Sequence, residues 1–221
     1  MKSCLTRPSF SFFFIYSFFP SYVSSCWAFS VTEQIESDWL RTGDGSEPIL
    51  SAQQVTSCTS YLIPGVGGCN GGKPESGYTY AETGLVLESD YPYTSGERGV
   101  TGDCDVPSSA SAQVKTVSYT NVANSASDES TMAAYVGNTG PLSIVVDASQ
   151  WSSYTGGILS TCGTSLDHAV QVVGIDTDEG SWKVRNSWGT SWGESGFIRL
   201  AYGDNTCGLT SDANYATVAS A

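Results

Sequence analysis

Cys26 and the only histidine of the chain, His168, stand 142 positions apart, and Asn186 follows the cysteine by 160 positions. A cysteine attacks a carbonyl carbon efficiently only as a thiolate, so it needs a nearby imidazole to take its proton and a third group to fix the tautomer of that ring. Each of the three roles has one candidate in this chain. A fold that uses them together must bring three distant segments to one place.

The composition indicates a globular protein with one large or two small domains. Its 221 residues, of which 40% are hydrophobic and 14% charged, can bury most of the surface that the unfolded chain exposes. The formal net charge of -13 comes from 22 acidic and 9 basic residues, without a long run of one sign. Phosphate binding needs clustered Lys and Arg, so we expect no nucleic-acid partner. The acidity is interpreted as a source of solubility.

The cysteine content indicates disulfides. Seven cysteines are too many for a typical reduced cytosolic protein, and an oxidising compartment fits them better. The sequence has no Cys-x-x-Cys pair and no Cys/His cluster with the spacing of a zinc site. We therefore expect neither a metal ion nor another cofactor.

A helix is predicted from Cys26 to about Arg41, because apolar residues recur there at helical spacing until a glycine-rich segment interrupts the pattern. These residues are Ala28, Val31, Ile35 and Trp39, and the interruption is Thr42-Gly43-Asp44-Gly45. Cys26 would lie in the first turn, where unpaired N–H groups and the helix dipole favour a thiolate and lower the pKa of the thiol. An amphipathic helix with a buried cysteine has the same periodicity, and only His168 and Asn186 distinguish the two interpretations.

The pattern changes from helical to extended along the rest of the chain. Short helices are predicted from Ser51 to Val55 and from Pro74 to about Thr83. Segments rich in β-branched and aromatic residues predict strands at 114–119, 142–146, 168–175, 182–184 and 197–200. A helical first half and a stranded second half indicate an α+β protein.

The motifs around these residues resemble the papain family of cysteine peptidases, in particular its cathepsin-like members. They follow the order of that family: Ser25 to Ser30, Cys69-Asn70-Gly71-Gly72, Gly140-Pro141-Leu142-Ser143, Tyr154-Thr155-Gly156-Gly157-Ile158, Asp167-His168-Ala169-Val170 and Asn186 to Arg199. The wide separation of Cys, His and Asn is also typical of papain and cathepsins. The resemblance implies a papain-like two-lobed fold in residues 26–221, with a helical lobe at about 26–112 and an antiparallel β-barrel lobe at about 113–221. The active-site cleft would lie between the lobes, with Cys26 on the helical wall and His168 and Asn186 on the barrel wall.

The activity that the resemblance implies is hydrolysis of peptide bonds through a thiolate–imidazolium pair of Cys26 and His168 and an acyl-enzyme. Asn186 would orient His168. Trp188 would either cover that contact or serve as an ordinary core residue, and the two roles are compatible. No second histidine is present to anchor the carboxyl end of a substrate, so we expect an endopeptidase. We expect a monomer that acts on peptides or proteins, outside the cell or in a lysosome or vacuole.

The resemblance further implies two disulfides, Cys58 with Cys104 and Cys162 with Cys207. Cys26 is left as the nucleophile. Cys69 would lack its usual partner, because the family places that cysteine three residues before the nucleophile and Val23 stands there. On the usual scale for a disulfide, this loss would loosen the loop that presents Cys26 by about 2 to 4 kcal/mol.

The glycine-rich segment Gly67-Gly68-Cys69-Asn70-Gly71-Gly72-Lys73 matches most of a phosphate-binding loop. Pro74 stands where a Ser or Thr must reach the metal ion, and no strand is predicted before the segment, so nucleotide binding is not expected. Glycine has no side chain and lets a substrate backbone approach closely. By resemblance, Gly72 would pair main chain to main chain with an extended peptide.

The resemblance also implies a specificity pocket, which in this family receives the second residue before the cleaved bond. Its lining would include Lys73, Pro74, Val145, Leu166 and Ala169, with Asp212 at its floor, and Gly71, Gly72, Asp167 and Trp188 complete the predicted substrate contacts. A carboxylate at the end of an apolar tube could accept Arg or Lys as well as Leu or Phe, which predicts a dual preference. Two alternatives remain, because an unpaired buried charge is costly: Lys73 neutralises Asp212, or Asp212 turns to solvent.

The first 25 residues depart from the family. An apolar run at 10–19 follows Lys2 and Arg7 and resembles a secretory signal peptide, and its ten residues are too few to span a membrane. Three interpretations compete: a genuine but aberrant protein, a signal peptide on an altered enzyme, and a wrongly assigned first exon. We favour the third, because the resemblance begins abruptly at Ser25.

Pro20 stands where the family has the glutamine whose side chain forms the oxyanion hole together with the backbone N–H of the nucleophile. Proline has no side-chain donor, and the loss of one such donor typically lowers turnover about a hundredfold or more. The alternative function is therefore a catalytically impaired papain-fold binding protein that retains Cys26, His168 and Asn186.

Overall fold

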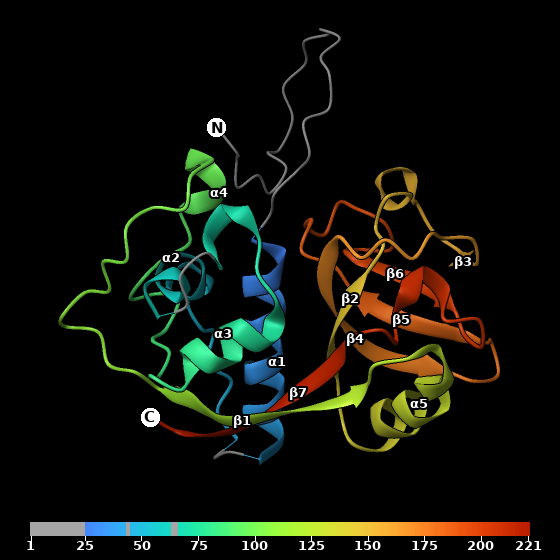
Figure 1. The fold of residues 1–221 in the computed structure, drawn as a ribbon, viewed down its shortest axis with the longest axis horizontal. Helices are drawn as coiled ribbons and strands as arrows, with labels where there is room; N and C mark the ends of the chain where they lie inside the picture. Colours follow the sequence, from blue (N-terminus) through green and yellow to red (C-terminus); the bar gives the residue numbers. More distant parts are fainter. Residues whose placement is uncertain (1–24, 43–44, 63–65) are drawn as a thin grey trace, which may run out of the picture.

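The structure is a computed structural model that describes residues 25–42, 45–62 and 66–221. The predictions made for Pro20, Val23 and the apolar run before them fall outside these residues. The helices are α1 (Cys26–Thr42), α2 (Ala52–Leu62), α3 (Pro74–Ala81), α4 (Ser95–Arg98) and α5 (Glu129–Asn138). The strands are β1 (Val114–Ala123), β2 (Leu142–Val146), β3 (Ile158–Leu159), β4 (His168–Asp176), β5 (Ser181–Arg185), β6 (Phe197–Ala201) and β7 (Ala213–Ser220). Figure 1 shows α1 to α4 together on one side and most of the sheet, with α5, on the other.

Helix α1 runs between the helices α2 and α3 on one side and the sheet on the other (Figure 1). Val31 and Ile35, from the predicted apolar stripe, are fully buried in the core of the helical half. Gly77 of α3 packs so closely that a Cβ atom there would lie 2.6 Å from a methyl group of Val31. The opposite face of α1 meets the sheet, where the Ser30 hydroxyl donates a hydrogen bond of 2.8 Å to the carbonyl oxygen of Val170. The predicted helix is confirmed, and it belongs to both halves of the molecule.

The strands form one sheet in the order β1-β7-β2-β4-β5-β6-β3. Neighbouring strands are antiparallel, except that the two-residue β3 pairs with β6 in parallel. Among the described strands β1 and β3 are the two edges, so the predicted antiparallel β-barrel lobe is an open, mostly antiparallel sheet. The physical reason is that β1 and β7 extend beneath the helices and pack against α3 and α1 (Figure 1).

Two hydrophobic cores correspond to the two lobes. One contains Trp27, Val31 and Tyr78, and it includes residues of β1 and β7. The other lies in the sheet around Trp151 and Trp182, and Met132 of α5 covers it. The predicted α+β class is thus confirmed. Because the last strand contributes to the helical core, the proposed division of the chain near residue 112 stays a prediction.

Each of the five predicted strands coincides with an observed one, and the two predicted short helices correspond to α2 and α3. The sequence patterns did not indicate α5 or β7. In β7 the side chains that face inward are small, and Ala213 and Ala216 are almost completely buried. The backbone N–H of Ala216 donates to the Asp38 carboxylate of α1 at 2.9 Å, so the strand lies directly against the helix. Alanines carry little of the β-branched and aromatic signal that usually indicates a strand.

The disulfides implied by the resemblance are confirmed: Cys58 with Cys104 and Cys162 with Cys207. The first joins α2 to the loop before β1, and the second joins the loop before β4 to the turn before β7. Cys69 is also disulfide-bonded. This corrects the expectation that Cys69 has no partner, although Val23 itself lies outside the described residues.

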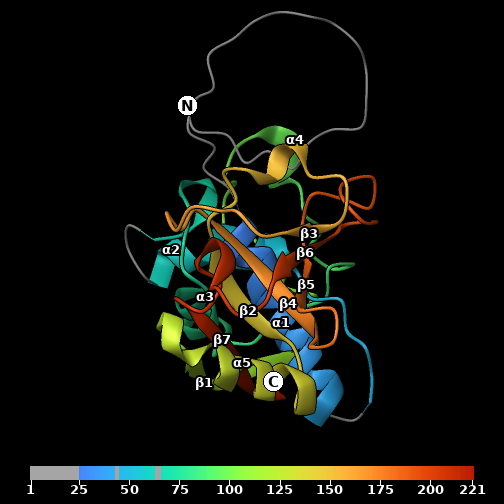
Figure 2. The same cartoon turned by 90° about the vertical axis from the view of Figure 1, so that its right-hand side faces the viewer.

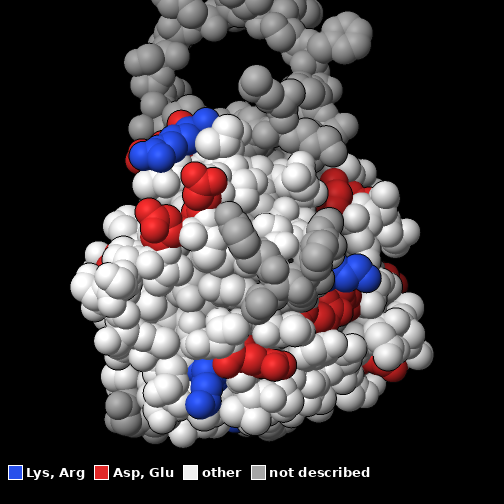
Figure 3. All heavy atoms as spheres, turned by 60° about the vertical axis from the view of Figure 1, so that its left-hand side comes forward, with Lys and Arg blue, Asp and Glu red and all other residues white. Residues whose placement is uncertain are grey.

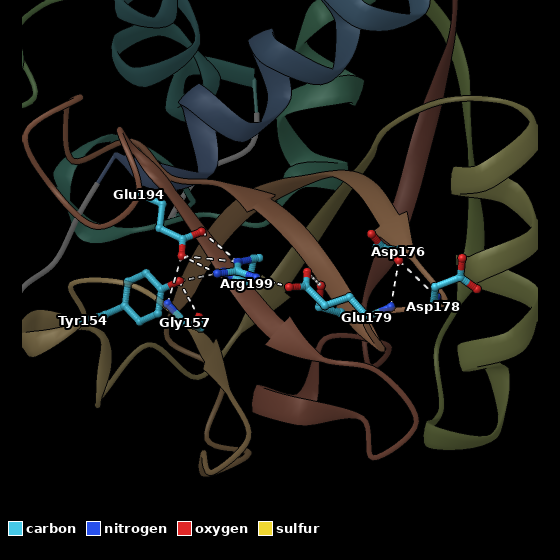
Figure 4. A network of polar contacts seen from close by, with 8 residues as sticks. Tyr154, Gly157, Asp176, Asp178, Glu179, Glu194 and Arg199 are labelled. Carbon is cyan, nitrogen blue, oxygen red and sulfur yellow. Dashed lines mark hydrogen bonds and ion pairs between the residues drawn. The ribbon is translucent and has the colours of Figure 1, made fainter.

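A network centred on Arg199 of β6 holds the loop that follows β5 (Figure 4). The guanidinium donates to both carboxylate oxygens of Glu194, at 2.9 and 2.8 Å, and to Glu179 at 2.6 Å. The backbone N–H of Gly157 donates to the same Glu194 carboxylate at 2.9 Å, which connects the loop to the start of β3. A bidentate pair of this kind has a defined geometry. It fixes the far end of the loop that begins at Asn186.

Candidate active site

Cys26 is the first residue of α1, at the end of the helix that meets β4. The N–H of Ala28 donates to the carbonyl oxygen of Ser25, the residue before the helix, at 2.9 Å, so Cys26 lies in the first turn. Cys26 is only 8% exposed. Its sulfur accepts a hydrogen bond of 3.4 Å from the backbone N–H of Ala169 in β4. The sulfur therefore lies where the helical half and the sheet meet.

His168 is the first residue of β4 and is also buried. Its register is fixed by Val146 of β2, directly opposite in the antiparallel pair. Burial lowers the pKa of His168, but the charge of Cys26 and hydrogen bonds with Cys26 and Asn186 outweigh this effect and raise the pKa above its ordinary value. The arrangement favours a thiolate next to an imidazolium.

Asn186 follows the last residue of β5 and lies against the imidazole. Its Oδ1 atom is 2.8 Å from Nε2 of His168 and also accepts the backbone N–H of Ser187 at 2.8 Å. An amide oxygen can only accept, so Nε2 carries the proton and Nδ1 is the ring nitrogen left for Cys26. The structure thus brings together the three predicted catalytic residues, from α1, β4 and the end of β5.

Trp188 stacks on the His168 ring, with the ring centroids 5.1 Å apart and the planes 27° apart. Trp151 meets the same imidazole edge-on at 5.9 Å. Trp188 is half-buried, whereas Trp151 is fully buried in the sheet core. Both predicted descriptions of Trp188 therefore apply, since it covers the imidazole and packs against the edge of the core.

Gly71 and Gly72 follow the 3-10 turn η1 (Gly68–Asn70), close to the start of α1. A Cβ atom at Gly72 would lie 2.7 Å from the indole ring of Trp27. That indole is held in place, because its Nε1 donates to the carbonyl oxygen of Gly68 at 3.2 Å. Glycine is therefore required at this position by packing within the protein, in addition to the predicted approach of a substrate.

The predicted pocket residues come from the two sides of the same boundary. Lys73 precedes α3 and Pro74 begins it, while Val145 and Ala169 face each other in the β2–β4 pair. The backbone N–H of Val145 donates to the carbonyl oxygen of Asp212 at 3.0 Å, which fixes Asp212 beside β2. The pairing of these strands thus places three of the predicted residues next to one another.

Leu166 and Asp167 lie in the loop that leads into β4, and they differ in their surroundings. Leu166 is 40% exposed, so its side chain is available at the surface. The carboxylate of Asp167 accepts the backbone N–H of Ala148 at 2.8 Å, and its own N–H bonds to the carbonyl oxygen of Val146 at 3.0 Å. These bonds join the ends of β2 and β4. Asp167 therefore has a structural reason to be present, next to its predicted role in substrate binding.

Asp212 is partly buried, and it faces a second carboxyl group, Glu75 of α3. Burial and the nearby charge of Glu75 raise the pKa of Asp212 to about 6, and the Asn214 amide and the charge of Lys73 partly oppose them. Asn214 Nδ2 donates to the Asp212 carboxylate at 2.8 Å. Within the described residues Lys73 is not within 4 Å of Asp212 in an ion pair. The charge of Lys73 thus lowers the pKa of Asp212 without a direct ion pair.

Two charged residues near the site were missed in the sequence. Glu75 lies one residue after Pro74, and an acidic residue in the first turn of a helix is common enough to attract no attention. Glu33 is seven residues, or two helical turns, after Cys26, and this spacing places both on one face of α1. That signal was available from the sequence.

Figure 3 shows the distribution of charged side chains on one face of the molecule. On the face drawn in Figure 3, Lys and Arg side chains stand apart from one another among acidic and uncharged ones. The described ranges contain no group of three or more His, Cys, Asp or Glu residues able to hold a metal ion. Within the same ranges, no helix has the length and apolar character needed to cross a membrane.

A sequence model of the papain family cysteine proteases matches residues 21–217, which is most of the chain. This chain belongs to the papain family. Cysteine proteinase A of Leishmania mexicana is 38% identical over 203 residues, covering 89% of this chain and 54% of that protein. The cathepsin L-like proteinase of Phaedon cochleariae is 39% identical over 203 residues, covering 88% of this chain and 59% of that protein. The chain thus spans little more than half the length of these papain-family relatives.

Solved structures of papain-family proteases share the fold. The Carica candamarcensis cysteine protease CMS1MS2, in complex with E-64, has a TM-score of 0.74 and 35% identity, covering 87% of this chain and 88% of that one. The bromelain protease of Ananas comosus, in complex with the E64 inhibitor, has a TM-score of 0.73 and 30% identity, covering 98% and 93% of the two chains. At these identities the likeness extends to sequence as well as architecture.

Proposed function

We propose that this chain is a cysteine endopeptidase in which Cys26 is the nucleophile, His168 the general acid and base, and Asn186 the group that orients His168. The observation that carries the proposal is the meeting of these residues at the boundary of the two lobes, with Asn186 Oδ1 2.8 Å from the imidazole. The raised pKa of His168 has the direction that a thiolate–imidazolium pair requires. Peptides or proteins are the proposed substrates, and a monomer in an extracellular, lysosomal or vacuolar setting is the proposed working form.

The proposed reaction uses each group at a defined atom. The Cys26 sulfur attacks the carbonyl carbon, and the peptide C–N bond breaks as His168 gives its proton to the departing amine. Water then attacks the thioester while His168 takes a proton, which releases the acid and restores the thiolate. The Oδ1 atom of Asn186 accepts the hydrogen bond from Nε2–H of His168 throughout, and Trp188 shields this contact from water.

The proposal is tested by alkylation with E-64, a thiol-directed peptidyl epoxide that is bound in the two protease structures described above. We expect rapid, stoichiometric labelling of Cys26, identified by mass spectrometry of the modified peptide. The His168→Ala variant should label only at the background rate of an ordinary thiol, because its sulfur has lost the imidazole that takes its proton. Equal labelling rates in the two proteins would refute the activated pair.

The second candidate function, a catalytically impaired binding protein, is favoured by one observation, the proline at position 20. Epoxide opening needs the thiolate, whereas amide hydrolysis also needs stabilisation of the oxyanion. Rapid labelling by E-64 combined with slow hydrolysis would therefore indicate this second function. Restoring a glutamine by Pro20→Gln should then raise turnover and leave the labelling rate nearly unchanged.

For specificity we propose that Asp212, with Glu75 beside it, accepts a basic side chain at the second position before the cleaved bond. The pKa of Asp212 is about 6, so its carboxyl is largely neutral at lower pH and charged above it. We expect the ratio of kcat/KM for Arg over Leu substrates to rise about tenfold between about pH 5 and about pH 7.5. The Asp212→Asn variant keeps the size of the side chain and should show a flat ratio. A ratio that rises equally in both proteins would exclude Asp212 as the receptor of the basic group.

A further inference from the structure

The face of α1 that carries Cys26 also carries Ser30, Glu33 and Ser37, at intervals of three or four residues. All of these contact the sheet. Ser30 bonds to the carbonyl oxygen of Val170, and the Gln171 side chain donates to the carbonyl oxygen of Glu33 at 3.2 Å and to the Ser37 hydroxyl at 3.0 Å. Figure 2 shows α1 behind β4, the strand that begins with His168, and the two elements are in contact. Glu33 lies on this side of α1, two turns after Cys26.

The Glu33 carboxylate of α1 forms an ion pair with Arg185 of the sheet. Glu33 is 7% exposed, and Oε1 is 3.3 Å from Nε of Arg185, the last residue of β5. Arg185 is held by its neighbours, because it pairs with Gln171 of β4 and with Phe197 of β6. The residue after Arg185 is Asn186, the partner of His168. The ion pair thus connects α1 to the last residue of β5, directly before Asn186.

The charged groups that act on Glu33 come from three elements. They are Arg185 of β5, His168 of β4 and Glu36 of α1 itself. Burial is the largest influence and raises the pKa of Glu33. The negative charge of Glu36 raises it further, the positive charges of Arg185 and His168 lower it, and the net pKa is about 7. The interaction with His168 is mutual, so a charged Glu33 favours the imidazolium form of His168.

We propose that Glu33 is a positioning residue for the catalytic histidine. Its carboxylate, paired with Arg185, holds the end of β5 so that Asn186 meets His168, and its negative charge stabilises the imidazolium. This inference rests on the proposed function, because it assigns Glu33 a role in the same Cys26–His168 pair. Only the charged carboxylate can pair with Arg185 and stabilise the imidazolium. The contribution of Glu33 to activity therefore grows as the pH rises through about 7 and is lost in acid.

The test is the pH profile of kcat/KM in the parent and in Glu33→Gln, which keeps the shape of the side chain and removes its charge. At about pH 5, where Glu33 is already neutral in the parent, the two proteins should agree within about twofold. On the alkaline side the variant should lose about threefold or more, because the pH at which His168 gives up its proton falls by about half a pH unit. A purely structural loss would lower kcat/KM equally at all pH values, and that result, or an unchanged profile, would overturn the proposal.

Glu36→Gln is the matched control, because Glu36 lies on the same helix and burial also raises its pKa to about 7. Its carboxylate accepts the backbone N–H of Leu50 at 2.7 Å, and its charge raises the pKa of Glu33. The Glu36→Gln variant should therefore keep the alkaline activity of the parent, with the contribution of Glu33 extending to slightly lower pH. Arg185→Met, at a half-exposed side chain, should reproduce the alkaline loss and provides the test if Glu33→Gln folds poorly. An Arg185→Met profile identical to that of the parent would likewise contradict the proposal.

The rate of E-64 labelling, measured over the same pH range, keeps this test independent of turnover. A protein that hydrolyses peptides slowly still reports the state of its Cys26–His168 pair through alkylation. If His168→Ala labels as fast as the parent, the proposed function itself fails. If His168→Ala is silent and Glu33→Gln follows the parent at every pH, only the role of Glu33 fails.

Discussion

Replacing His168 with alanine is expected to lower kcat/KM for a peptide substrate by about a thousandfold or more, the largest effect on activity predicted for this chain. The imidazole is the only group in the described site that is hydrogen-bonded to both Cys26 and Asn186. Without it, the sulfur has no acceptor for its proton and the leaving amine has no donor. The measurement is the initial rate of cleavage of a fluorogenic peptide, with active protein quantified by its folded fraction.

The Asn186→Ala substitution is expected to lower activity less than His168→Ala does. It leaves the imidazole in place but removes the oxygen that accepts both the His168 Nε2 proton and the Ser187 N–H. We expect a loss of about ten- to a hundredfold, because the ring is still present but free to turn and to exchange tautomers. A His168→Ala variant that keeps more than about a tenth of the parental rate would contradict the proposed mechanism.

The proposed catalytic residues could be named from the sequence because the chemistry allows few residue types and the chain offers one histidine. The helix behind Cys26 was equally accessible, since its buried stripe repeats at the period of a helix. Strands β2, β4 and β5 consist of β-branched and apolar residues and are flanked by turns, so they were found as well. In each case a local pattern or a chemical requirement determined the structure.

Other features depend on contacts that a local pattern does not contain. Strand β7 lies against α1 and buries two alanines, which carry little strand signal, and the order that leaves β1 and β3 at the edges of the sheet depends on long-range pairing. Glu33 and Glu75 look like the solvent-facing charges of ordinary helices until the sheet is placed against them. The need for glycine at position 72 was attributed to substrate alone, whereas the Trp27 ring already excludes a side chain there. Tertiary packing determined all of these.

Glu36→Gln is expected to make the protein more stable than the parent at about pH 7.5, by about 2 to 3 kcal/mol, and to leave its stability at about pH 4 nearly unchanged. Burial raises the pKa of Glu36 from 4.5 to about 7 in the folded state. A carboxyl with a raised pKa binds its proton more tightly when folded, so its favourable contribution is complete below the unfolded pKa and is lost as pH rises through the folded one. The glutamine keeps an oxygen that accepts the Leu50 N–H, and it carries no charge that must be buried.

The measurement is thermal or denaturant unfolding of both proteins across this pH range. For a chain of this size, the expected difference at about pH 7.5 corresponds to about 5 to 10 °C in Tm. Glu33 carries a similar shift with the same sign, so the parent should be more stable in mild acid than at neutral pH. A Glu36→Gln variant whose Tm falls below that of the parent at about pH 7.5 would show that Glu36 is held as a stabilising charge, contrary to the effect of its burial. If the prediction holds, the helix that carries Cys26 also makes the folded protein more stable in mild acid, because burial favours the protonated form of two of its carboxyl groups.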